Sequence, residues 1–180
     1  MTGYLPVQFD PTFEPQRGGK LPGLYMSPAN PADVRGGSGS KHCPGRASCR
    51  MMWRSGWQAE AYVYSDSARD SPGYTALPGS HFNDRYGDSL WRGVLQFQPQ
   101  GWNEVAVRVR LNTMGQADGL LRVTVNGKMC EFDQMRWRSV PDTVVSALFF
   151  CTFYGGSSEK FACPQDTCVR FRGFAVTRFA

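Results

Sequence analysis

Four side chains that suit chemistry on an acidic sugar fall on one predicted hairpin at residues 46–65. A short, glycine-centred loop of three residues separates its two arms. With that loop, Arg50 pairs with Tyr62. Ser48 then pairs with Tyr64, and alternation along the strands puts all four side chains on one face of the sheet. A hydroxyl, a guanidinium and two phenols on one face indicate a site that holds a carboxylated sugar and removes a proton from it.

A second stretch that suits chemistry lies upstream, where Lys20 is flanked by glycine-rich turns. Gly18 and Gly19 precede the lysine, and Pro22-Gly23 follows it. This composition predicts an unusual backbone path that holds one cation in a defined place. The same composition is typical of a surface turn with a solvated lysine, and taken alone it favours that simpler interpretation.

Two long loops flank the hairpin. Residues 27–45 are rich in Pro, Gly, Ser and Asn, and residues 66–90 are polar and irregular. The second loop is expected to form the rim of a groove, and its Tyr86 is a candidate substrate contact. A single histidine such as His81 is more typical of a structural or merely exposed residue.

Strand patterns recur along the rest of the chain, and no segment shows a helical period. Predicted strands cover residues 91–98, 104–111, 120–125, 128–133, 144–154 and 168–177. The apolar run at 144–154 is expected to be a central buried strand. Asn126-Gly127 is a strong hairpin signal. Regularly spaced strands with glycine turns predict an all-β fold, a jelly-roll sandwich of two antiparallel sheets, in a single domain over residues 1–180.

Composition and charge narrow the class of partner. Hydrophobic residues at 41% and charged residues at 19% are typical of a globular protein, and no apolar stretch approaches the length of a membrane span. The net charge is +5, and most of the positive charge is arginine, which suits carboxylate or phosphate. No nucleic-acid motif is present, and aromatics do not interleave with a basic stripe. We therefore expect an acidic polysaccharide as partner, no nucleic acid or membrane, and a monomer.

The six cysteines form three candidate pairs, which are Cys43 with Cys49, Cys163 with Cys168, and Cys130 with Cys151. Each of the first two pairs can close a small loop, whereas the third pairs across a sheet or remains as buried thiols. No Cys-x-x-Cys spacing is present and the chain has only two histidines, so we expect no metal site. The close pairs favour an oxidising compartment and predict a secreted or extracellular protein, although the N-terminal residues do not read as a signal peptide.

Several short motifs follow one another along the chain. They are Gly-Gly-Lys-Leu-Pro-Gly-Leu at 18–24, Ser-x-Arg-Met-Met-Trp-Arg at 48–54, Tyr-Val-Tyr at 62–64, Val-Arg-Leu-Asn-Thr at 109–113, Ala-Asp-Gly at 117–119 and Phe-Phe-Cys-Thr-Phe-Tyr-Gly-Gly at 149–156. Each is weak alone, but in this order they are specific. From Val7 onward the chain resembles the polysaccharide lyase family 14 alginate and glucuronan lyases, although members of that family carry more chain before the lysine motif than the 19 residues found here.

The resemblance implies a jelly roll with a cleft on its concave sheet, and β-elimination on a 1,4-linked uronic acid polymer. Carried over by matching motif, the cleft residues are Lys20, Ser48, Arg50, Tyr62 and Tyr64. We expect Ser48, with Arg54 and Tyr86, to contact the substrate rather than to react. The close cysteine pairs, Cys43–Cys49 and Cys163–Cys168, also resemble disulfides found in relatives.

Such chemistry needs a fixed cation and a base. Removal of the proton on C5 builds negative charge on the neighbouring carboxylate, so a cation beside it stabilises the transition state more than the ground state. Arg50 and Lys20 are the candidates, and no metal ligand set or cofactor motif is visible in the sequence. Nearby cations favour a phenolate, so Tyr62 or Tyr64 is a candidate base that can later protonate O4. Lys20 is the alternative base if its own pKa is lowered.

Two functions from different classes fit these residues. The first is a polyuronate lyase that needs no metal, with alginate and glucuronan both open as substrates. The second is a non-catalytic jelly-roll module that binds acidic polysaccharide through its positive charge.

Overall fold

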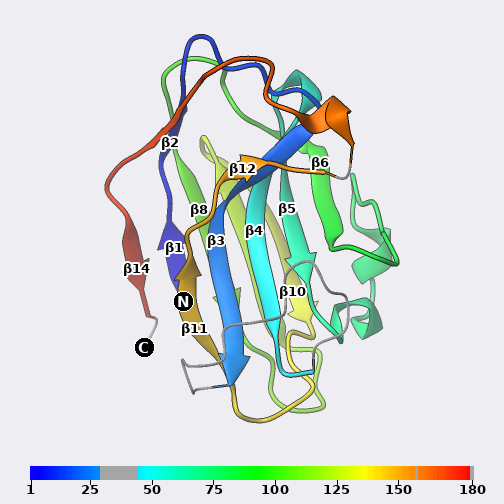
Figure 1. Cartoon of the computed structure of the whole chain (residues 1–180). Coiled ribbons are helices and arrows are strands. Elements are labelled where there is room, and N and C mark those ends of the chain that lie inside the picture. Colours follow the sequence, from blue (N-terminus) through cyan, green and yellow to red (C-terminus); the bar gives the residue numbers. More distant parts are fainter. Residues whose placement is uncertain (29–43, 157, 179–180) are drawn as a thin grey trace.

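The computed structural model of the chain describes residues 1–28, 44–156 and 158–178. Antiparallel β-sheets lie face to face in a sandwich (Figure 1), and the helices among these residues are short 3-10 turns. The predicted all-β jelly-roll class is confirmed.

Two large sheets and one small sheet build the sandwich. The first large sheet consists, in order, of β10 (Lys128–Met135), β9 (Gly119–Val125), β8 (Val105–Arg110), β1 (Thr2–Tyr4) and β14 (Ala175–Thr177). The second consists, in order, of β11 (Thr143–Phe149), β3 (Gly18–Pro28), β4 (Ala47–Arg54), β5 (Gln58–Tyr64) and β6 (Asp88–Gln96). The short strand β12 (Phe153–Tyr154) also pairs with β3. The small sheet, β13-β2-β7, contains Val169–Phe171, Val7–Phe9 and Trp102–Asn103. The 3-10 helices η1 to η4 span Ser55–Trp57, Ala68–Asp70, Tyr74–Ala76 and Glu159–Phe161.

The core forms where alternate side chains of the large sheets point inward. On β4, Cys49, Met51 and Trp53 are almost completely buried in the main hydrophobic cluster. The same cluster contains Val107 and Val123 from the other large sheet. The remaining β4 side chains therefore point to the opposite face of their sheet, where the polar residues gather.

The predicted hairpin is present with the predicted register. The three residues of η1 join β4 to β5, and Gly56 within them has a positive φ of 67°. Arg50 pairs with Tyr62. Ser48 pairs with Tyr64, so the loop length and the strand alternation were sufficient to fix this pairing.

The segment around Lys20 is a strand and not the predicted turn. It belongs to β3, which lies between β11 and β4 inside the sheet. Its register with β4 shifts between Lys20 and Gly23, which marks a β-bulge. A Cβ atom at Gly23 would lie 2.0 Å from the carbonyl oxygen of Cys49, so the close approach of the two strands requires glycine there.

Two other strand predictions are wrong. Within the described residues β11 is the edge strand of its sheet and ends at Phe149, and the next residue, Phe150, is 53% exposed. The apolar run at 144–154 is therefore not a central strand. The predicted last strand at 168–177 is divided at Gly173, where φ is 54°, into β13 and β14 of different sheets.

The predicted disulfide between Cys163 and Cys168 is also wrong. Both thiols are free and turn to different acceptors, because Cys163 Sγ donates to the Gln165 carbonyl at 2.8 Å and Cys168 Sγ donates to Asp10 Oδ2 at 3.4 Å. Cys49 is a free thiol inside the core, where burial raises its pKa to about 12. Its predicted partner, Cys43, lies outside the described residues. Cys130 and Cys151 are free thiols as well.

Candidate active site

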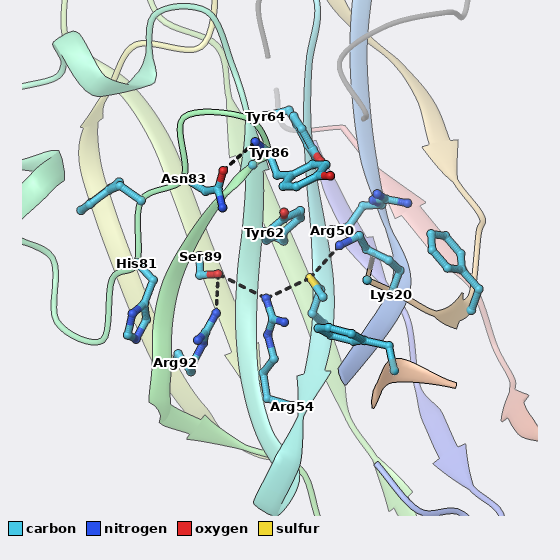
Figure 2. A pocket seen from close by; sticks show the side chains of 17 residues that line it. Lys20, Arg50, Arg54, Tyr62, Tyr64, His81, Asn83, Tyr86, Ser89 and Arg92 are labelled. Carbon is cyan, nitrogen blue, oxygen red and sulfur yellow. Dashed lines mark hydrogen bonds between the residues drawn. The ribbon is translucent and has the colours of Figure 1, made fainter. Parts of the chain in front are cut away.

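A cavity of about 570 Å³ lies on the polar face of the second large sheet (Figure 2). Its floor carries Lys20 from β3, Arg50, Met52 and Arg54 from β4, Tyr62 and Tyr64 from β5, and Ser89 and Arg92 from β6. Its walls include His81 and Tyr86 from the β5–β6 connection and Phe153 from β12. All four side chains predicted to be catalytic therefore line one cavity.

Lys20 points across the floor toward β5. Its Nζ lies 3.8 Å from the centroid of the Tyr62 ring and donates to Met52 Sδ at 3.1 Å. Burial, with the positive charges of Arg50 and Arg54 acting in the same direction, lowers its pKa to about 7. The amine is therefore available in its neutral, proton-accepting form near neutral pH.

Arg50 is the fixed cation of the floor. Only 2% of its surface is exposed, and its guanidinium carbon lies 4.5 Å from the centroid of the Phe149 ring. Burial lowers its pKa, and the Cys151 thiol beside it acts in the opposite direction. A guanidinium nevertheless stays charged in proteins, and a charge at a site sheltered from water acts strongly on a bound anion.

The two phenols lie next to each other, with the ring centroids of Tyr62 and Tyr64 5.4 Å apart in an edge arrangement. Burial raises the pKa of Tyr62 well above its usual value, and Tyr64 beside it acts in the same direction. We expected nearby cations to lower the pKa of this phenol. Its pKa is raised instead, because loss of solvent outweighs the charge of Arg54. Tyr62 is therefore a protonated phenol, suited to donate a proton rather than to accept one.

An ionic cluster that the sequence analysis missed lies beside the phenols. Glu60 on β5 is fully buried and binds Arg54 from β4 and Arg92 from β6, with shortest distances of 2.6 Å to each. Strand alternation was the signal that could have found it, because Glu60 stands two residues before Tyr62 on the same face.

The other predicted substrate contacts differ in their positions. Arg54 and Tyr86 line the cavity, and Tyr86 packs against the small apolar cluster that contains Met52 and Tyr62. Ser48 is fully buried and is not among the described residues that line the cavity. His81, expected to be structural or exposed, lines the cavity and pairs through its backbone with Ser89.

The polar side chains of the cavity are cations, phenols and other hydrogen-bonding groups, set among apolar residues such as Met52 and Phe153. Across residues 1–28, 44–156 and 158–178, no group of three or more His, Cys, Asp and Glu side chains is arranged to hold a metal ion. No helix in that part of the chain is both long and apolar enough to cross a bilayer. The chemistry that these side chains can supply is stabilisation of an anion and transfer of protons.

The family model Polysaccharide lyase 14 matches residues 1–174 of the chain. Among curated proteins, the chain is similar to Exolysin of Paramecium bursaria Chlorella virus 1, with 27% identity over 179 residues. This match covers 90% of the chain and 27% of Exolysin, so the chain spans about a quarter of the length of that relative.

Solved structures share the fold. The marine PL-14 alginate lyase from Aplysia kurodai is 29% identical with a TM-score of 0.85, over 96% of this chain and 67% of that chain. The alginate lyase vAL-1 from Chlorella virus is 24% identical with a TM-score of 0.76, over 96% of this chain and 68% of that chain. At 24% identity, the similarity to the Chlorella virus enzyme shows a shared fold and nothing more.

Proposed function

The chain belongs to the polysaccharide lyase 14 family, and from this premise we propose that it is a polysaccharide lyase that cleaves a 1,4-linked polyuronate by β-elimination. The observation that carries the proposal is the meeting of Lys20, Arg50 and Tyr62 in one cavity. A neutral amine, a fixed cation and a protonated phenol are the three groups that such an elimination requires.

In the proposed reaction, Arg50 binds the carboxylate of the reacting sugar and stabilises the charge that builds there as C5 loses its proton. The neutral amine of Lys20 accepts that proton. The electron pair of the C5–H bond forms the C4=C5 double bond, and the C4–O4 bond breaks. The phenol of Tyr62 gives its proton to the departing O4, and Tyr64 supports that phenol. None of these steps requires a metal.

Arg54 and Tyr86 are proposed as substrate contacts along the cavity. Ser48, which is buried opposite Tyr64 on the same face of the sheet, is proposed to act through its neighbours on β4 and β5 rather than by direct contact. Alginate is the first substrate to test, because the Aplysia relative is an alginate lyase, and glucuronan is the second. We also propose that the protein acts on this polymer outside the cell, as a monomer.

The test is direct. The protein is incubated with alginate and with glucuronan, and the ultraviolet absorbance of the unsaturated product is followed over time. A Lys20→Ala protein that is shown to be folded is the control and should give at least about a hundredfold slower signal. If the folded wild-type protein releases no unsaturated product from any polyuronate but still binds the polymer, the protein is a binding module instead.

A further inference from the structure

Two arginines surround one buried carboxylate on the β6 side of the cavity. Arg54 donates to Glu60 Oε1 from Nε at 2.9 Å and from Nη2 at 2.6 Å. Arg92 donates from Nε to Glu60 Oε2 at 2.6 Å. Both arginines also line the cavity, with 15% and 26% of their side chains exposed. The single negative charge of Glu60 thus pairs with the two positive charges of Arg54 and Arg92, so the cluster presents a net positive charge to the cavity.

The donors of this cluster are only partly used. The Ser89 hydroxyl donates to Glu60 Oε1 at 3.0 Å. It also accepts from Arg92 Nη2 at 2.8 Å, which orients the second guanidinium (Figure 2). A guanidinium has five N–H donors. Among the described residues, no acceptor contacts Nη1 of Arg54 or Nη1 of Arg92, so both retain donors for a ligand that enters the cavity.

We propose that Arg54 and Arg92 form a second carboxylate-binding subsite, which takes a uronate residue other than the one that reacts, and that Glu60 is the positioning residue of this subsite. The proposal rests on the proposed function, because it assumes a polymer with a carboxylate on every sugar. A planar guanidinium pair matches the geometry of a carboxylate better than two flexible ammonium groups would.

The position of the subsite sets a minimum length for a good substrate. Lys20 is on β3 and Arg92 is on β6, three strands away in the sheet. At the usual spacing between strands these two backbones lie about 14 Å apart, but the side chains shorten that distance, because Lys20 Nζ and Arg54 Nη2 both contact Met52 Sδ, at 3.1 Å and 3.7 Å. The subsite therefore begins beside the reacting position at Arg54 and continues to Arg92, so it takes the carboxylate of a neighbouring sugar on the β6 side.

A purely structural role for the cluster makes a different prediction. If both arginines served only to neutralise Glu60, their loss would reduce stability and would affect short and long substrates equally. If they form a subsite, the loss of kcat/KM must grow with chain length, and it must appear in KM more than in kcat because the subsite binds a sugar that does not react.

The experiment measures kcat and KM of the full chain on purified oligouronates of increasing length. Arg92→Gln is expected to raise KM for long oligomers by at least about tenfold, because a charged hydrogen bond to the substrate is lost. This rise in KM should become smaller as the oligomer becomes too short to reach β6. Arg122→Gln is the matched control, because Arg122 pairs with Glu131 on the other large sheet and its replacement makes the same change in charge. The control should keep the wild-type dependence on length.

Arg92→Lys keeps a positive charge beside Glu60 and guards against a folding defect in Arg92→Gln. It should unfold close to the wild-type temperature and show an intermediate rise in KM for long oligomers. A loss that is the same at every length in both variants would overturn the subsite while the lyase proposal stood. If the wild-type protein cleaves no polyuronate, binding of the same oligomers is measured by calorimetry, and an affinity that Arg92→Gln leaves unchanged would also overturn the subsite.

Discussion

The amine of Lys20 lies over the ring of Tyr62, with Nζ 3.8 Å from the ring centroid. Loss of solvent is the largest cause of the shifted pKa of both groups, and it moves them in opposite directions. The lysine becomes neutral at lower pH than usual, and the phenol stays protonated to higher pH. One sheltered position therefore provides a base and an acid together, which is the pairing that an elimination needs.

The first prediction concerns the dependence of the rate on pH. Because the base must be unprotonated and the pKa of Lys20 is lowered to about 7, kcat/KM should rise with pH with a midpoint near 7. Rates between about pH 5 and pH 11 on one polyuronate provide the measurement. A rise whose midpoint lies near 10 instead would assign the base to a phenol.

The second prediction concerns the phenols. Tyr62→Phe should lower kcat by about a hundredfold or more, because the departing O4 loses its proton donor. Tyr64→Phe should have a similar effect, because it removes the group that supports Tyr62. Tyr4→Phe is the control, since Tyr4 is an exposed tyrosine on the other large sheet. Steady-state rates and unfolding temperatures are measured for all three, and wild-type turnover in both site variants would remove the phenols from the mechanism.

Much of the site could be predicted from local patterns. Turn length and side-chain alternation were sufficient to place Arg50 opposite Tyr62, because a strand has a fixed period of two. The strand around Lys20 was not predictable in the same way, since three glycines between residues 18 and 23 have low strand propensity and a bulge interrupts the pairing. The glycines of this strand allow the neighbouring strands to pack closely and do not form a turn.

The acid and base roles could not be assigned from the sequence. The direction of the pKa shift of Tyr62 depends on whether burial or nearby charge dominates, and burial is a property of the assembled sheet. Similarly, Glu60 was overlooked because its two partners, Arg54 and Arg92, lie on different strands. Only the order of strands in the sheet brings them together.

A third prediction links the site to stability. The pKa of Lys20 is about 7 in the folded protein and 10.5 without the fold. Below pH 7 both states hold the proton, so the folded state carries the full cost of a desolvated ammonium. Between these values only the unfolded chain binds the proton, so the free energy of unfolding rises with pH.

Lys20→Met should therefore be more stable than the wild-type protein at pH 6, by on the order of 2–4 kcal/mol, with a difference that shrinks toward pH 10. Urea denaturation at both pH values measures it. Lys128→Met, at an exposed position on β10, is the control and should show no such pH-dependent gain. A gain for Lys20→Met that is identical at the two pH values would mean that the charge of the amine is not its source.

The last prediction tests the bulge that directs Lys20 into the cavity. A Cβ atom at Gly23 would lie 2.0 Å from the Cys49 carbonyl oxygen and 2.5 Å from the Arg50 Cα, and both are backbone atoms that cannot rotate away. Gly23→Ala must therefore separate β3 from β4. We expect it to destabilise the protein by about 2–4 kcal/mol and to lower kcat/KM, because Lys20 and Arg50 stand on the two strands that move apart.

Gly115→Ala separates this effect from ordinary glycine strain. Gly115 has a φ of 77° but nothing within 4 Å of its added Cβ, so its replacement should cost only about 1 kcal/mol and leave kcat/KM unchanged. Urea denaturation and rates on one polyuronate are compared for both variants. If Gly23→Ala matched Gly115→Ala in stability and kept full activity, the close approach of β3 and β4 would not be what positions the lysine beside the arginine.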